Sequence, residues 1–242
     1  MTSSIEDDVP VDALPADDED EPFTRMDAWN GIFDSSLRWE EDIEILNALA
    51  DTARNGDWTS LIDLLLRQLR LCPNDWCPDD PSFDTIMHRA ARWGAPVDVI
   101  EQLIKLGGWR NIKNAQGERP IDIARRLHHD HLLSVLEPEL VFDIPVETIS
   151  ALQSHFHNLI KKVIVDDGID DEVKLVQVMP DLNVLLEQKD LKMWFEIHKM
   201  YGGFRYCLDP AKEKICLRVT CWSRVADIED GYVVTPSGWA KQ

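Results

Sequence analysis

The 242-residue chain lacks the features of a membrane or secreted protein. No apolar run approaches the ~18 residues that are needed to cross a bilayer. The first eight residues, Met1–Asp8, contain neither the basic stretch nor the apolar stretch of a secretory signal. The five cysteines are an odd number, which favours free thiols over a disulfide framework. These absences predict a cytoplasmic protein without a membrane partner.

Basic charge is also scarce. The chain holds 25 Lys and Arg residues against 45 Asp and Glu residues, a net charge of −20. A field of that sign repels phosphate backbones, so the sequence argues against a nucleic-acid partner.

Motifs of catalysis and metal binding are missing as well. Ser223 and Ser237 lie outside any nucleophile elbow, and the glycine pairs form no phosphate-binding loop. Cys72 and Cys77 have a spacing that some zinc sites use, but no second pair of ligands follows. We therefore expect no catalytic residues, no metal and no cofactor.

The first 41 residues divide into two parts. Residues 1–22 carry nine carboxylates and no Lys or Arg, which is typical of a disordered acidic tail, or of an acidic arm that docks on a basic surface. Residues 23–41 place Met26, Trp29, Phe33 and Leu37 at steps of three and four. This spacing predicts a short amphipathic segment that covers the start of the next domain.

The spacing of apolar residues in 42–138 predicts successive pairs of amphipathic helices. The spacing from His88 to Asp122, and from Ala90 to Ala124, is 34 residues. A period of about 33 residues with paired helices is typical of ankyrin repeats.

Residues 84–117 resemble an ankyrin repeat in detail. The residues at positions of the family's T-P-L-H-x-A-A-x-x-G run are Thr85, Met87, His88, Ala90, Ala91 and Gly94. Gly107, Asn111 and Gly117 match the family's finger loop, and Pro120–Ala124 resembles its P-L-D-L-A variant. The resemblance implies about three stacked repeats with a concave protein-binding surface, and structural roles for His88 and His129.

Residues 139–242 depart from the repeat and predict a small α+β domain with an antiparallel sheet. A helical stripe runs from Ile149 to Val163, and residues 203–208 and 215–222 alternate with period two, as in a β-hairpin. The strings at 201–204 and 221–225 resemble a module of some bacterial ankyrin proteins, which implies no established activity. The expected fold class is therefore α+β overall, an all-α ankyrin stack followed by this domain.

The repeats also carry an unusual charge balance. Residues 84–131 hold eight basic and six acidic side chains, a local charge of +2. The ankyrin register places seven candidate partner-binding residues on or near the concave face: Arg92, Trp93, Trp109, Arg110, Lys113, Gln116 and Arg126. Tryptophan and arginine are enriched at interface hot spots. The plainer alternative is that Trp93 and Trp109 pack between repeats while the charges are solvated.

Together these patterns predict a scaffold for protein–protein interaction, with an acidic segment as a candidate ligand. The alternative is an enzyme or toxin-neutralising (immunity-like) factor that acts through the C-terminal domain, for which a polar pocket around His198, Tyr201 and Arg224 would be the evidence.

Overall fold

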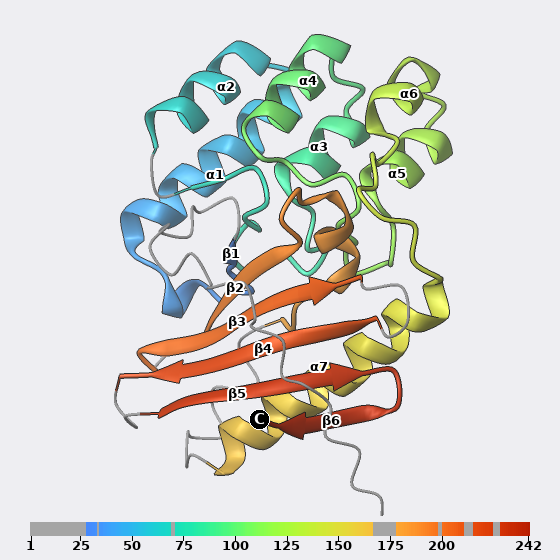
Figure 1. Ribbon diagram of the computed structural model, residues 1–242. Helices are drawn as coiled ribbons and strands as arrows, with labels where there is room; N and C mark the ends of the chain where they lie inside the picture. The colour runs from blue at the N-terminus through green and yellow to red at the C-terminus, as the bar shows by residue number, and fades with distance from the viewer. Residues whose placement is uncertain are drawn as a thin grey trace, which may run out of the picture.

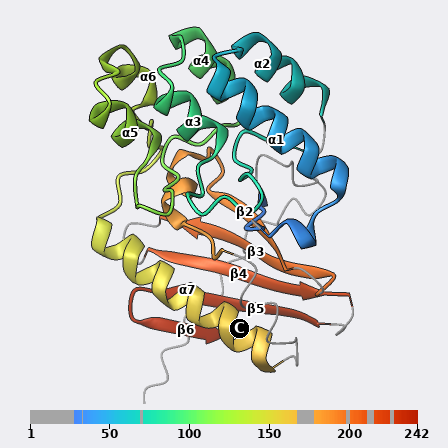
Figure 2. The same ribbon diagram turned by 180° about the vertical axis from the view of Figure 1, so that it is seen from behind.

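The computed structural model describes residues 28–32, 34–68, 71–166, 178–197, 200–210, 215–224 and 228–242. The chain is α+β. A layer of helix pairs lies beyond one edge of a six-stranded sheet, and a long helix covers one face of the sheet (Figures 1 and 2). The acidic residues 1–22 lie outside the described part of the chain.

The helical layer contains three successive helix pairs. Their elements are α1 (Glu40–Asn55), α2 (Trp58–Arg67), α3 (Ile86–Arg92), α4 (Val97–Lys105), α5 (Pro120–Arg126), and η3 (Asp130–Leu132) running into α6 (Leu133–Leu136). The first helices α1, α3 and α5 form the row nearer the sheet, and the second helices form the outer row (Figure 1). The loops that follow α2 and α4 descend towards the sheet (Figure 1).

The first helix of every pair ends with the same backbone geometry. In each case an amide donates to the carbonyl five residues earlier: Asp57 to Thr52 (2.9 Å), Ala95 to Ala90 (3.0 Å) and His129 to Ala124 (2.9 Å). The residue before each donor has positive φ, and these residues are Gly56 (71°), Gly94 (63°) and His128 (59°). This is the helix-ending arrangement that glycine favours. The same local structure therefore recurs in all three pairs, 38 residues apart between Gly56 and Gly94 and 34 apart between Gly94 and His128, where histidine replaces glycine.

One apolar core fills the helical layer. Met87, Ala90, Ala91, Ile100 and Leu103 are buried, as are Ile121, Ile123 and Ala124, whereas Ile104 is half-buried. Small alanines on α3 and α5 allow these neighbouring helices to pack closely.

The sheet has the order β1-β2-β3-β4-β5-β6. Its strands are β1 (Ala28–Trp29), β2 (Lys192–Ile197), β3 (Gly202–Asp209), β4 (Cys216–Ser223), β5 (Ile228–Thr235) and β6 (Gly238–Lys241). The predicted pairing of residues 203–208 with 215–222 is confirmed, with Tyr206 opposite Val219. The buried alternation Phe204, Tyr206, Leu208 faces α7 (Val146–Asp166), whose Phe156 ring lies 4.9 Å from that of Tyr206.

The segment before α1 differs from its prediction. Residues 28–29 are a strand parallel to β2, so the sheet is mixed, and strands are not confined to the C-terminal part. A 3-10 turn, η2 (Ser35–Leu37), follows. The expected helical stripe through Trp29 and Leu37 is therefore wrong, while Met26 and Phe33 lie outside the described residues. Tertiary contacts decide the conformation, because the Trp29 indole is buried and donates to Val178 O at 2.8 Å.

Candidate interaction face

The structure separates the seven candidate partner-binding residues into two groups. Trp109 and Arg110 point into the junction between the helical layer and the sheet, where they are largely buried. The other five remain at the surface to different degrees: Arg92, Trp93, Lys113, Gln116 and Arg126.

Trp109 belongs to a buried tryptophan cluster. Its ring stacks on that of Trp29 with centroids 5.8 Å apart and an interplanar angle of 7°. Trp76 meets Trp29 edge-on at 5.6 Å. Trp109 is only 4% exposed, so its expected role as a partner-binding residue on the surface is wrong. It packs the loop after α4 against the sheet's edge strand, because a large aromatic surface gains most from burial.

Arg110 is held by a carboxylate of the sheet domain. Glu187, at the end of η4 (Leu182–Glu187), accepts the backbone amides of Arg110 (3.0 Å) and Asn111 (2.6 Å). Its Oε2 also lies 3.4 Å from the Arg110 Nε, and both side chains are nearly buried. Burial raises the pKa of Glu187, while the two backbone amides and the Arg110 charge act in the opposite direction. Arg110 therefore serves the junction within the chain, and its assignment to the free surface is corrected.

The remaining arginines of the face are paired with acids of neighbouring loops. Arg92 Nε donates to Asp84 Oδ2 at 3.0 Å, and Asp84 Oδ1 accepts from Asn114 Nδ2 at 2.9 Å. Arg126 makes a two-point contact with Glu118, at 2.6 and 2.9 Å. The hydrogen bond from Arg126 lowers the pKa of Glu118. The local positive charge is thus largely compensated in place.

Histidines join successive helix pairs. His88 Nδ1 accepts the amide of Thr85 at 3.1 Å, and its Nε2 lies 3.1 Å from Glu118 O in the next loop. Burial lowers the pKa of His88 to about 4, so the ring is neutral at pH 7. His129 contacts Arg92 O at 3.2 Å in the same manner. These contacts agree with the structural roles expected for both residues.

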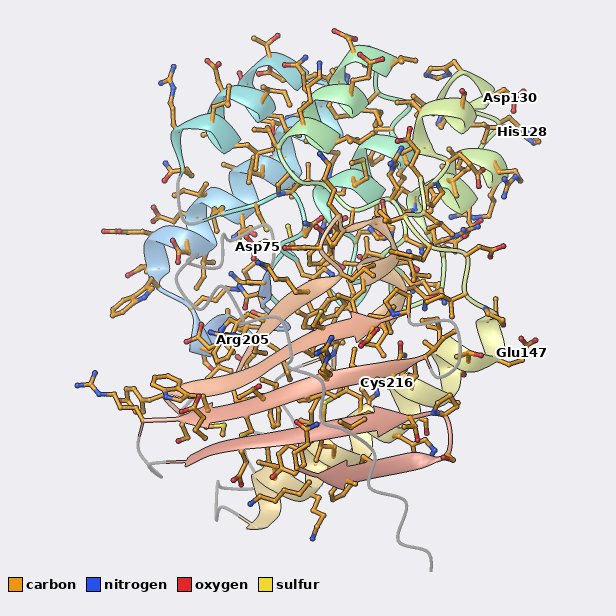
Figure 3. All side chains as sticks on the ribbon, viewed as in Figure 1. Asp75, His128, Asp130, Glu147, Arg205 and Cys216 are labelled. Carbon is orange, nitrogen blue, oxygen red and sulfur yellow. The ribbon has the colours of Figure 1, made fainter. Side chains whose placement is uncertain are left out.

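The exposed part of the face is consequently small. Trp93, at the end of α3, keeps 48% of its surface exposed. Lys113 and Gln116 are exposed on the loop between α4 and α5, and Arg126 is exposed at the end of α5. His128 and Asp130 continue the exposed surface at the outer end of the helical layer (Figure 3).

The C-terminal domain shows no corresponding reactive constellation in its described part. His198 lies outside the described residues. Tyr201 is 70% exposed and Arg224 is exposed, and neither lines either of the two cavities beside Trp29. Among the residues that the structure describes, no three His, Cys, Asp or Glu side chains gather as metal ligands. Within that same part of the chain, no helix is long and apolar enough to cross a membrane.

No family model matches the sequence. Sequence reasoning missed Glu187, because a lone glutamate in a short apolar segment carries no pattern that indicates a partner 77 residues away.

Proposed function

We propose that this chain is an ankyrin-repeat protein that acts as a protein–protein interaction scaffold, without a catalytic role. The observation that carries the proposal is the threefold recurrence of one helix ending, at Gly56, Gly94 and His128, within stacked helix pairs. Stacked pairs of about 33 residues are the ankyrin architecture, whose extended concave surfaces bind proteins.

The binding surface that we propose is narrower than the sequence suggested. It consists of Trp93, Arg92, Lys113, Gln116 and Arg126, which we call the concave face. Trp93 is a half-exposed aromatic that follows Arg92 in the chain, and tryptophan with arginine is a composition typical of hot spots. Because Asp84 and Glu118 already pair with the arginines of the concave face, an acidic segment of a partner must exchange with them. We therefore expect modest, salt-sensitive affinity.

The experiment is affinity capture with the tagged full chain, followed by mass spectrometry. The face variant combines Trp93→Ala with Arg126→Glu. The matched control combines Leu66→Ala with Arg67→Glu on α2, an exposed apolar residue beside an arginine in an exposed ion pair. A protein captured by the wild type and the control but lost with the face variant would support the proposal. Identical capture by all three chains would rule out the concave face as the binding surface.

A further inference from the structure

A second surface lies where the helical layer meets the sheet edge. Its side chains carry a net negative charge, whereas residues 84–131 carry a net positive one. A cavity of about 540 Å³ is lined by β1, η2, the start of α1, the loop around Asp75 and β2. Figure 3 shows Asp75 between the helices and the sheet. This volume is within the range of about 300–1,000 Å³ that is usual for ligand sites.

Tryptophans line the cavity from its buried part to its open part. Trp29 is 3% exposed, Trp194 is half-buried and Trp39 is 75% exposed. An indole that is largely exposed in the free protein leaves apolar surface for a ligand to cover. Indole faces also attract cations, since the ring quadrupole places negative potential above the plane.

The charges in the cavity wall favour the same kind of ligand. The described lining residues include one arginine, Arg38, against three carboxylates, a net charge of −2. Arg38 is turned inward, with its guanidinium 3.5 Å from Asp75 Oδ1 and both side chains nearly buried. It also donates to Ile32 O at 2.7 Å. Asp42, in the first turn of α1, adds a carboxylate to the cavity wall beside Trp39.

The surrounding helices extend this negative potential. Residues 40–67 hold seven acidic and two basic side chains, whereas residues 84–131 carry the opposite balance. The acids in the first turn of α1 are explained in part by the helix dipole. The dipole does not explain an exposed tryptophan directly before them, or the cavity that Trp39 shares with Asp42.

We propose that this cavity binds an arginine side chain from a basic segment of a protein partner. A guanidinium stacks flat on an indole and pairs with a carboxylate in the same pose, which an ammonium does less well. The surface is distinct from the concave face, so the two proposals stand or fall separately.

The experiment titrates the full chain with a short synthetic peptide, Gly-Arg-Gly-Arg-Gly, by calorimetry. A second peptide replaces both arginines by citrulline, which has nearly the same shape without the charge. The protein variants are Trp39→Ala and Asp42→Asn. Their matched controls are Trp222→Ala, at another exposed tryptophan that does not line the cavity, and Asp63→Asn, an exposed acid on α2.

The arginine peptide should bind measurably, and citrulline should abolish binding. Trp39→Ala should weaken binding about two- to thirtyfold, the range from an exposed to a desolvated cation–π contact, while Trp222→Ala changes it little. Trp39→Phe should restore part of the affinity. Asp42→Asn should weaken binding more than Asp63→Asn does.

Three outcomes would overturn the proposal. Absence of binding at millimolar peptide would show that the cavity does not take the guanidinium. Equal binding of the citrulline peptide would show that charge is not recognised. Equal effects of the Trp39 and Trp222 variants, or of the Asp42 and Asp63 variants, would show that only the overall negative field attracts the peptide. Because Trp39 is exposed, unchanged thermal midpoints will confirm that the variants are folded.

Discussion

Replacing Glu187 by alanine tests how the helical layer is held against the sheet domain. The carboxylate accepts two successive backbone amides, from Arg110 and Asn111, and faces the Arg110 guanidinium. Among the described residues, the buried arginine would then keep one ion pair, with Glu139 at 3.6 Å, whose side chain is 90% exposed. The backbone amides of Arg110 and Asn111 would then lose their acceptor, and the Arg110 guanidinium would lose its nearly buried counter-ion.

The expected loss follows from the burial of the pair. Removing one partner of a buried ion pair destabilises a protein by about 3–5 kcal/mol, because the other charge stays buried without compensation. Glu187→Gln keeps an oxygen that can accept one amide but also removes the negative charge, so a loss near the lower end of that range, about 3 kcal/mol, is expected. Removing both partners, in the Glu187→Ala, Arg110→Ala double variant, should be less damaging than the sum of the two single changes.

The measurement is the free energy of unfolding from urea denaturation of the wild type, of the single variants Glu187→Ala, Glu187→Gln and Arg110→Ala, and of the double variant. Arg126→Ala is the control, because its pair with Glu118 is exposed and should contribute less than about 1 kcal/mol. A loss below about 1 kcal/mol in Glu187→Ala would refute the reasoning, since a buried pair cannot behave like a surface one. Strict additivity in the double variant would refute the direct coupling of the two residues.

Three further predictions concern the core. Ala90→Asp should lower the free energy of unfolding by about 3–5 kcal/mol, as an unpaired buried charge, whereas Ala115→Asp at an exposed position should change it little; similar thermal midpoints would contradict the packing of α3. The pKa of His88 falls from 6.5 unfolded to about 4 folded, so the unfolded state binds the extra proton. The contribution of neutral His88 to the free energy of unfolding should therefore be fully present above pH 6.5 and decrease by about 3 kcal/mol as the pH falls to 4. An equally steep decrease in His88→Gln would exclude the histidine as its cause. Trp29→Ala should destabilise by about 3–5 kcal/mol through loss of the aromatic cluster, far more than Trp39→Ala; equal effects would refute the role of the cluster.

Regular periodicity explains what could be read without the structure. The helix pairs from α1 to α6, the long α7 and the β3–β4 hairpin all have local patterns that repeat over many residues. Patterns of this length fix which face of an element is buried, and the burial of Ala90, Leu103 and Tyr206 agrees with them. The candidate interaction face was identified less well, since periodicity does not say whether an exposed register position meets solvent or another part of the chain.

The sequence by itself determined the α+β class, the three helix pairs, the 34-residue spacing of the last two, and the alternation of the sheet strands. These depend on contacts between residues close in the chain or on one repeated face. Only the tertiary structure decided that Ala28–Trp29 forms a strand beside β2, that Trp109 stacks on Trp29, and that Glu187 holds Arg110. Each of those contacts joins residues more than 70 positions apart, and a two-residue strand or a single carboxylate has too few local preferences to reveal its partner.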